Sequence, residues 1–126
     1  MARVLVVDDD EEIRHTLRLL LEDADHEVLE SPTGADALER LRQPGTLVVL
    51  LDLLMPRIDG VEVLRQVAED QDLLARHAYI VVTADSRTLL TAAQPLVEAV
   101  GAAVIQKPFD VDTLLAAVDR AAEAHG

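Results

Sequence analysis

Aspartates that follow apolar runs are the first residues in this chain whose types and spacing could do chemistry. Asp8, Asp9 and Asp10 directly follow one such run, and Asp52 directly follows another. Carboxylates held close together repel one another unless a cation or protons compensate their charge. Mg²⁺ suits such a cluster, because this hard ion accepts one or two carboxylates and keeps several waters. The pattern therefore indicates a divalent-metal site.

Each of these aspartates also has a purely structural explanation. Asp8, Asp9 and Asp10 could cap a helix that begins near Glu11, where acidic groups favour the helix dipole. We accept this explanation for Asp10 and leave it open for the other two. Asp52 interrupts an apolar stretch, where an unpaired carboxylate is costly to bury. It could bond to loop amides, or it could act as a nucleophile beside a metal ion.

A lysine and a threonine complete the set of polar residues that follow apolar runs. Lys107 is the single lysine among the 11 basic residues of the chain, and it stands between an apolar run and Pro108. Its ammonium group could pair with Asp52 and later with a phosphoryl oxygen, whereas the ordinary alternative is a surface lysine. Thr83 would add a hydroxyl donor, although by itself it could simply end a strand.

The spacing of the apolar runs predicts the strands that must position these residues. The runs recur at intervals of roughly 20 to 30 residues, which is typical of repeated strand–helix units. Most of them are apolar at consecutive positions, as expected for strands that are covered on both faces of a parallel sheet. We predict strands at residues 4–7, 28–29, 47–51, 79–82 and 102–105.

The stretches between the runs carry helical periodicity. We predict helices at residues 13–24, 38–41, 64–67 and 111–122. Thr33 and Asp110 stand where the N-caps of such helices belong. Residues 86–99 are expected to be helical in part, with Pro95 ending or kinking the helix, because proline removes a backbone donor.

Strands that alternate with helices in this way indicate an α/β fold. We predict a doubly wound, five-stranded parallel sheet with helices on both faces. We expect one domain over residues 1–126 without an output domain; a fragment of a larger α/β domain is the alternative. Ligands of open parallel sheets bind at the carboxyl ends of the strands. The residues expected to meet at that edge are Asp8, Asp9, Asp52, Thr83 and Lys107.

Composition excludes several classes of function. With 24 acidic and 11 basic residues the formal net charge is −13, so nucleic acids and anionic membrane surfaces would be repelled. The absence of cysteine excludes disulfides, thiol catalysis and cysteine metal sites. No apolar stretch approaches the roughly 18 residues that cross a bilayer, and carboxylates end the first apolar run too early for a signal peptide. We expect a cytoplasmic location.

Four short motifs occur in order along the chain. They are VLVVDDD at residues 4–10, LLDLLMPRIDG at 50–60, VVTAD at 81–85 and QKPF at 106–109. Each is weak alone, but together and at nearly the usual spacing they resemble the receiver domain of two-component response regulators. The resemblance covers the whole chain. Within the family, the chain is similar in type to the single-domain, chemotaxis-type regulators. It implies the flavodoxin-like (βα)5 fold.

The resemblance also implies roles for individual residues. Asp52 would be the phosphoacceptor, and Thr83 and Lys107 would bind phosphoryl oxygens. The implied ligands of Mg²⁺ are Asp8, Asp9 (directly), Asp52 and the backbone carbonyl of Leu54. A histidine kinase or phosphotransfer protein would supply the phosphoryl group. The phosphorylated domain would then regulate a partner protein by a conformational change, without being a turnover enzyme.

Three features of the chain bear on this resemblance. The family usually carries Tyr or Phe at the position of Val104, so we predict that output does not use an aromatic rotamer switch. The Lys107–Pro108 peptide bond is expected to be cis, as the resemblance implies. None of the four histidines matches the motifs, and we interpret them as surface or packing residues.

Two other functions use similar residues. An aspartate-nucleophile phosphohydrolase also needs Asp, Thr and Lys near Mg²⁺, but it usually has a second Asp two residues after the nucleophile, where this chain has Leu54. An interaction module that is not phosphorylated would not need both Asp52 and Lys107. A flavin-binding domain is excluded, because its first loop would offer amides and hydroxyls to a phosphate rather than carboxylates.

Overall fold

Strands and helices alternate along this chain, except that two helices lie between the third and fourth strands. The structure is a computed structural model, and it describes residues 2–53, 60–83 and 87–125. The strands are β1 (Arg3–Val7), β2 (Glu27–Ser31), β3 (Val48–Asp52), β4 (Ala78–Thr83) and β5 (Ala103–Gln106). The helices are α1 (Glu11–Asp23), α2 (Gly34–Leu41), α3 (Gly60–Ala68), α4 (Gln71–Arg76), α5 (Arg87–Val100) and α6 (Val111–His125).

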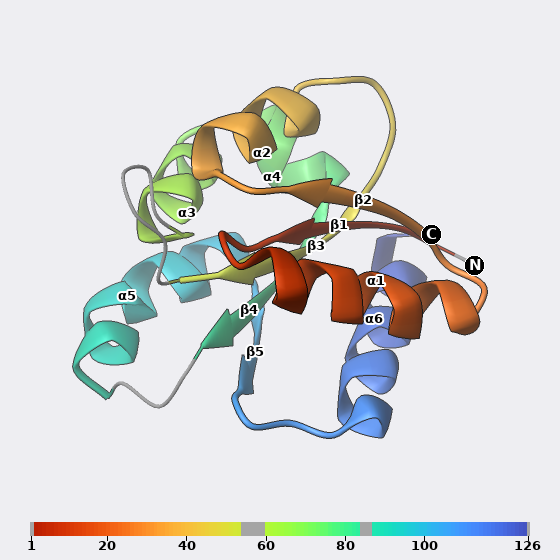
Figure 1. Cartoon of the computed structure of the whole chain (residues 1–126). Coiled ribbons are helices and arrows are strands. Elements are labelled where there is room, and N and C mark those ends of the chain that lie inside the picture. The colour runs from red at the N-terminus through yellow and green to blue at the C-terminus, as the bar shows by residue number, and fades with distance from the viewer. Residues whose placement is uncertain (1, 54–59, 84–86, 126) are drawn as a thin grey trace.

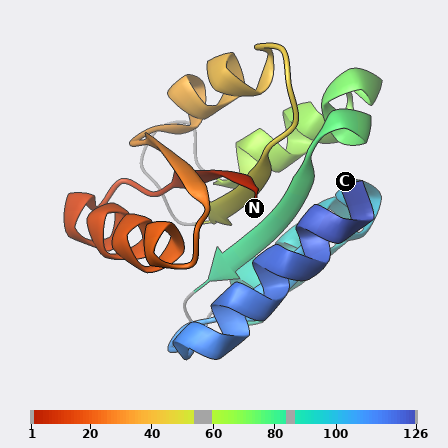
Figure 2. The same ribbon diagram turned by 90° about the vertical axis from the view of Figure 1, so that its right-hand side faces the viewer.

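The strands form one parallel sheet in the order β2-β1-β3-β4-β5. Helices α1 and α6 pack on one face of the sheet, and the other helices pack on the opposite face (Figure 1; Figure 2). The chain moves outward from β1 to β2 and then crosses to β3, so the strand order reverses between β1 and β3. This is the place where open α/β sheets bind ligands. The predicted fold is confirmed.

Consecutive residues of each central strand enter two different cores. Leu5 and Val7 of β1 contact the core beneath α2, α3, α4 and α5, whereas Val4 and Val6 contact the core beneath α1 and α6. All four are at most 1% exposed. The unbroken apolar runs in the sequence therefore reflect burial on both sides of the sheet.

Three helices begin at side chains that cap them, as predicted. Asp10, Thr33 and Asp110 each accept hydrogen bonds from backbone amides two or three residues further along. For Asp10 the partners are the amides of Glu12, at 2.9 Å, and Ile13, at 3.3 Å. The structural explanation of Asp10 is thus confirmed, and this aspartate stabilises α1.

Helix α4 was not expected from the sequence. Its six residues contain a single buried apolar side chain, Leu73, so no helical stripe marks the segment. Asp70 nevertheless caps it by accepting hydrogen bonds from the amides of Asp72 and Leu73. Among the residues that the structure describes, no helix is both long and apolar enough to cross a membrane.

Pro95 lies inside α5 and does not end it, so of the two predicted effects of this proline only a kink remains a prediction. The helix instead runs to Val100 and ends at Gly101, whose φ of 73° is readily adopted by glycine. The amides of Gly101 and Ala102 both bond to the carbonyl oxygen of Val97, at 3.0 Å each. Hydrogen bonds of this kind satisfy the last carbonyls of a helix, so glycine sets the end of α5.

Candidate functional site

The carboxyl ends of β1 and β3 place three aspartates together. Val7 pairs with Leu51, so Asp8 and Asp52 follow side by side on neighbouring strands. One carboxylate oxygen each from Asp8, Asp9 and Asp52 lies within 4.8 Å of the other two. Asp8 is 3% exposed and Asp52 is 9% exposed, whereas Asp9 lies at the surface. The fold therefore assembles the predicted acidic cluster.

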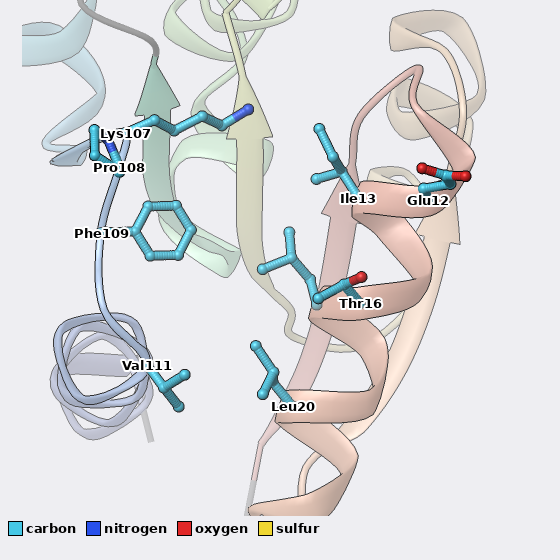
Figure 3. Close-up of a pocket in the computed structure, with 9 residues that line it drawn as sticks. Glu12, Ile13, Thr16, Leu20, Lys107, Pro108, Phe109 and Val111 are labelled. Carbon is cyan, nitrogen blue, oxygen red and sulfur yellow. The ribbon is translucent and has the colours of Figure 1, made fainter.

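The ends of β4 and β5 add a cation to this cluster. Thr83 pairs with Gln106, and the amide of the following residue, Lys107, donates a 2.8 Å hydrogen bond to the carbonyl oxygen of Thr83. The Lys107 side chain extends across β4 toward β3 (Figure 3). Its Nζ lies 3.8 Å from Oδ2 of Asp8 and 3.9 Å from Oδ2 of Asp52. The Thr83 residue is itself 1% exposed at the same edge of the sheet.

Burial makes the carboxylate of Asp8 harder to ionise. Desolvation is the largest influence and raises the pKa of Asp8 above its ordinary value of 3.8. The hydrogen bond from the Asp10 amide and the charge of Lys107 lower this pKa by less. A further cation beside Asp8 would favour its ionised form.

The donor set fits a divalent cation. The three carboxylates carry up to three negative charges, against one ammonium group within ion-pair distance of two of them. Oxygen donors on a partly open surface are the ligands that Mg²⁺ prefers, because this ion keeps several of its waters. Within the described ranges, no other group of three acidic or histidine side chains is close enough to share a metal ion.

Two further residues anchor the loop that carries Asp8. The amide of Asp8 donates to the carbonyl oxygen of Ser31 at 3.2 Å, and its carbonyl oxygen accepts from Nη1 of Arg14 at 2.7 Å. Sequence reasoning did not find Arg14 or Ser31 as part of the site. No sequence motif marks either residue as part of a site. Both contacts depend on how α1 and β2 pack beside β1.

An apolar groove runs beside the site, between α1 and the chain that leads into α6. Its volume is about 640 Å³. Ile13 and Leu20 line it from α1, and Phe109 and Val111 line it from the opposite side (Figure 3). Lys107 also lines the groove, and its ion pairs with Asp8 and Asp52 connect this apolar surface to the acidic cluster.

Several predicted site residues lie outside the described part of the chain. Leu54, whose carbonyl was expected to bind the metal, is one of them, together with most of the LLDLLMPRIDG motif. Its last residue, Gly60, is described as the first residue of α3. The Lys107–Pro108 peptide bond is cis, as predicted.

The histidines that the structure describes in detail are packing or surface residues. His77 is 1% exposed; its Nδ1 accepts from the amide of Leu47 at 3.0 Å, and its Nε2 lies 2.8 Å from the carbonyl oxygen of Leu41. These partners require a neutral ring that donates from Nε2. His26 is also buried and accepts from the amide of Ala2, whereas His15 is exposed.

Comparison with known proteins identifies this arrangement. PilH from Pseudomonas aeruginosa is 38% identical over 88 residues, covering 70% of this chain and 73% of that protein. CpdR, a response regulator receiver protein from Brucella abortus, is 39% identical over 74 residues, covering 58% of this chain and only 62% of CpdR. The crystallised chemotaxis protein CheY4 from Vibrio cholerae superimposes with a TM-score of 0.81 at 30% identity, over 96% of this chain and 98% of that one.

A family model also matches most of the sequence. The model of the response regulator receiver domain matches residues 4–119. That span contains β1 except for Arg3, the other four strands and all three aspartates of the acidic cluster, together with Thr83 and Lys107. The chain therefore belongs to the response regulator receiver domain family.

Proposed function

We propose that this receiver domain accepts a phosphoryl group on Asp52 in a Mg²⁺-dependent reaction. Membership of the response regulator receiver domain family implies phosphorylation-based signalling, and this supports the residue assignments that we propose below. Asp8, Asp9, Asp52 and the backbone carbonyl of Leu54 would hold Mg²⁺, and Thr83 and Lys107 would bind phosphoryl oxygens. The receiver domain would comprise residues 1–126 and act in the cytoplasm as a signalling module rather than a turnover enzyme.

One observation carries this proposal: the carboxylate of Asp52 lies at the junction of the acidic cluster and the lysine. It is 9% exposed, it shares the 4.8 Å cluster with Asp8 and Asp9, and its Oδ2 lies 3.9 Å from Nζ of Lys107. The nucleophile thus stands where cationic groups can neutralise the charge of an incoming phosphoryl group.

The transfer would be a single displacement at phosphorus. A carboxylate oxygen of Asp52 forms the new P–O bond, while the bond from phosphorus to the donor breaks and the donor keeps the electron pair. Bound Mg²⁺ would neutralise charge on the transferring group. The ammonium of Lys107 would remain charged throughout and bind one phosphoryl oxygen, while the hydroxyl of Thr83 would donate to another.

The groove beside Lys107 supports a protein donor. We assign it to a helix of the histidine kinase or phosphotransfer protein that carries the phosphorylated histidine. Its lining is apolar on both sides, from Ile13 and Leu20 to Phe109 and Val111, and Lys107 belongs to both the groove and the acceptor site. A helix seated there would lie directly beside Asp52. The phosphorylated domain would then regulate a partner protein through a conformational change.

Incubation with acetyl phosphate and Mg²⁺ tests the acceptor assignment. We expect the intact mass of the wild-type protein to rise by one phosphoryl group, and we expect Asp52→Asn to gain none. Asp23→Asn, which removes an exposed carboxylate of α1, is the matched control and should be phosphorylated like the wild type. Phosphorylation of Asp52→Asn at the wild-type rate, or a wild-type reaction that a metal chelator leaves unchanged, would contradict the proposal.

A further inference from the structure

We infer that Arg14 is a positioning residue for the metal site, because it orients the peptide unit that joins Asp8 to Asp9. This inference rests on the proposed function, since it concerns the same Mg²⁺ site. Arg14 lies on α1 and is not one of the proposed metal or phosphoryl ligands. It would act through the backbone of the loop that carries two of them.

The guanidinium of Arg14 connects three elements. Its Nη1 donates a 2.7 Å hydrogen bond to the carbonyl oxygen of Asp8, directly after β1. Its Nε donates to Oε1 of Glu30 on β2 at 3.2 Å. The side chain of Arg14 is only 13% exposed, so solvent screens these contacts less than it would at an open surface.

The carbonyl that Arg14 binds sets the geometry of both aspartates. The carbonyl group of Asp8 and the amide and Cα of Asp9 lie in one peptide plane, so a donor that orients this carbonyl also orients the Cα of Asp9. The other side of Asp8 is held independently: its amide bonds to Ser31 at 3.2 Å, and its Oδ1 accepts from the Asp10 amide at 2.9 Å. Without Arg14, the peptide unit between the two carboxylates would lose its side-chain restraint.

Glu30 keeps Arg14 in place. Its second carboxylate oxygen accepts a 2.8 Å hydrogen bond from Nη1 of Arg18, and this bond is the main reason that the pKa of Glu30 lies below its ordinary value. Glu30 therefore remains ionised at neutral pH and continues to accept from Arg14. Arg18 shares Glu30 with Arg14, but its hydrogen bonds run to Glu22 and Glu30 rather than to the metal-binding loop.

Arg18 consequently offers a matched control. Arg14→Ala and Arg18→Ala each remove one guanidinium from Glu30, but only Arg14→Ala removes the donor to Asp8. Loss of a group that orients metal ligands typically weakens metal affinity by roughly 10- to 100-fold. We expect Arg14→Ala to raise the Kd for Mg²⁺ by about 10-fold and Arg18→Ala to leave it unchanged. Arg14→Lys should fall between wild type and Arg14→Ala, because a lysine can donate to Asp8 or Glu30 but does not reproduce the planar fork.

The experiment is a calorimetric titration of the wild type and of each variant, over residues 1–126, with MgCl₂; thermal unfolding in chelator is the folding control. The rate of phosphorylation by acetyl phosphate is then measured against Mg²⁺ concentration. We expect Arg14→Ala to need more Mg²⁺ for half-maximal rate and to approach the wild-type rate at saturation. A defect of folding alone would lower the saturated rate instead.

Each other outcome overturns the inference. An unchanged Kd in Arg14→Ala, or in Arg14→Lys if the alanine variant does not fold, shows that the peptide unit needs no such restraint. An equal rise in Arg18→Ala assigns the effect to Glu30 and the packing of α1 on β2. Wild-type binding of Mg²⁺ with an unaffected Arg14→Ala overturns only this inference, whereas a wild-type protein that binds no Mg²⁺ overturns the proposed function as well.

Discussion

Asp8 and Asp9 are neighbours in the chain, but the fold gives their carboxylates different environments. Asp8 is 3% exposed and directly follows β1, beside Asp52 at the end of β3, whereas Asp9 is exposed to solvent. Water can hydrate the charge of Asp9 freely. The charge of Asp8 is desolvated, and Lys107 at 3.8 Å compensates for this only in part. In the metal-free protein, the electrostatic cost of the acidic cluster therefore falls mainly on Asp8, whose charge is desolvated by burial.

We predict that Asp8→Asn stabilises the metal-free protein at neutral pH. The asparagine oxygen can still accept from the amide of Asp10, while the buried charge is lost. In urea unfolding at pH 7 with chelator, we expect the free energy of unfolding to rise by about 1 kcal/mol, the size of a typical single-residue effect. With excess Mg²⁺ the wild type should gain stability and Asp8→Asn should gain less, because binding stabilises only the state that holds the ion.

The pH dependence of this effect follows from the direction of the pKa shift. The pKa of Asp8 is higher in the folded than in the unfolded protein, so the folded state binds the proton more tightly. Stability from this group is fully present below the ordinary pKa of 3.8 and is lost as pH rises through the folded pKa. The advantage of Asp8→Asn should therefore shrink toward acidic pH. Asp9→Asn, at an exposed site, should change stability less; an Asp8→Asn variant that is less stable in chelator would contradict the prediction.

At the scale of elements, the start of α3 packs tightly against the end of β3. A Cβ atom added to Gly60 would lie 2.6 Å from Cα of Leu53 and still closer to the carbonyl oxygen of Asp52. Both atoms belong to backbone, which cannot rotate away as a side chain can. The absence of a side chain at Gly60 thus lets a helix begin beside the proposed phosphoacceptor.

We predict that Gly60→Ala destabilises the protein and slows its phosphorylation. Replacing a helical glycine by alanine would ordinarily stabilise a helix by up to about 1 kcal/mol. Here the clash should dominate and lower the free energy of unfolding by roughly 1–3 kcal/mol, as overpacking does. Phosphorylation by acetyl phosphate should slow because the clash displaces the backbone of Asp52.

Gly101→Ala separates these two effects. A Cβ at Gly101 would meet nothing within 4 Å, but the φ of 73° disfavours any residue with a side chain. This variant should lose stability through backbone strain and keep the wild-type rate of phosphorylation. If Gly60→Ala is as stable as the wild type, the tight packing of α3 on β3 has no energetic consequence and the prediction is wrong.

Helix α5 is the element in which we expect the response to phosphorylation. Pro95 cannot donate to the carbonyl of Thr91, so the helix lacks one internal hydrogen bond. Val104 on the neighbouring edge strand is 40% exposed and stiff at χ1, and it has no ring to move. Phosphorylation shifts a conformational equilibrium only through contacts that differ between the two states.

Hydrogen exchange on the phosphorylated and unphosphorylated protein measures which segments respond to phosphorylation. We expect the largest change in protection between residues 84 and 99, and little change in β5. If protection instead changes mainly at Val104 and in α6, while the protection of residues 84–99 stays constant, α5 does not carry the response to phosphorylation. A Val104→Ala variant, which alters β5 without introducing a ring, should leave the pattern as in the wild type.

At the scale of the whole molecule, the apolar groove and the acceptor site form one continuous surface. Segments distant in sequence, α1 and the chain from Lys107 to Val111, build the two walls of the groove. Lys107 lines this groove (Figure 3), and its Nζ lies 3.8 Å from Oδ2 of Asp8 in the acidic cluster. A small phosphodonor needs only the acceptor site, whereas a protein donor would use both.

We predict that Leu20→Ser slows phosphotransfer from a histidine kinase several-fold and leaves the reaction with acetyl phosphate unchanged. Leu20 lines the groove, so its loss removes apolar contact with the donor but no acceptor group. Leu19, the preceding residue on α1, is 54% exposed and is not part of the groove lining. Leu19→Ser is therefore the matched control and should behave like the wild type in both reactions. Equal effects of the two variants would show that the donor docks elsewhere.

The parallel sheet, its two buried faces and the approach of the acidic cluster to the lysine could all be predicted from the amino-acid sequence. Apolar runs at consecutive positions report burial on both faces, and parallel strands bring their carboxyl ends to one edge. The polar residues that follow those runs therefore meet whatever the details of packing. For this reason the sequence predicts that Asp8, Asp52, Thr83 and Lys107 lie together, as the strand pairing and the ion pair of Lys107 with Asp8 show.

The burial of each of these groups, the contacts that hold the loop after β1 and the groove beside it depend on how the helices pack on the sheet. The hydrogen bond from Arg14 to Asp8 depends on the rotation of α1 against β1 and β2, which no local pattern encodes. The six-residue helix α4 and the passage of α5 through Pro95 likewise depend on packing and capping that override local preference. The groove exists because two segments about 90 residues apart face each other. Contacts between elements, unlike periodicity within them, are set by the relative placement of whole helices on the sheet.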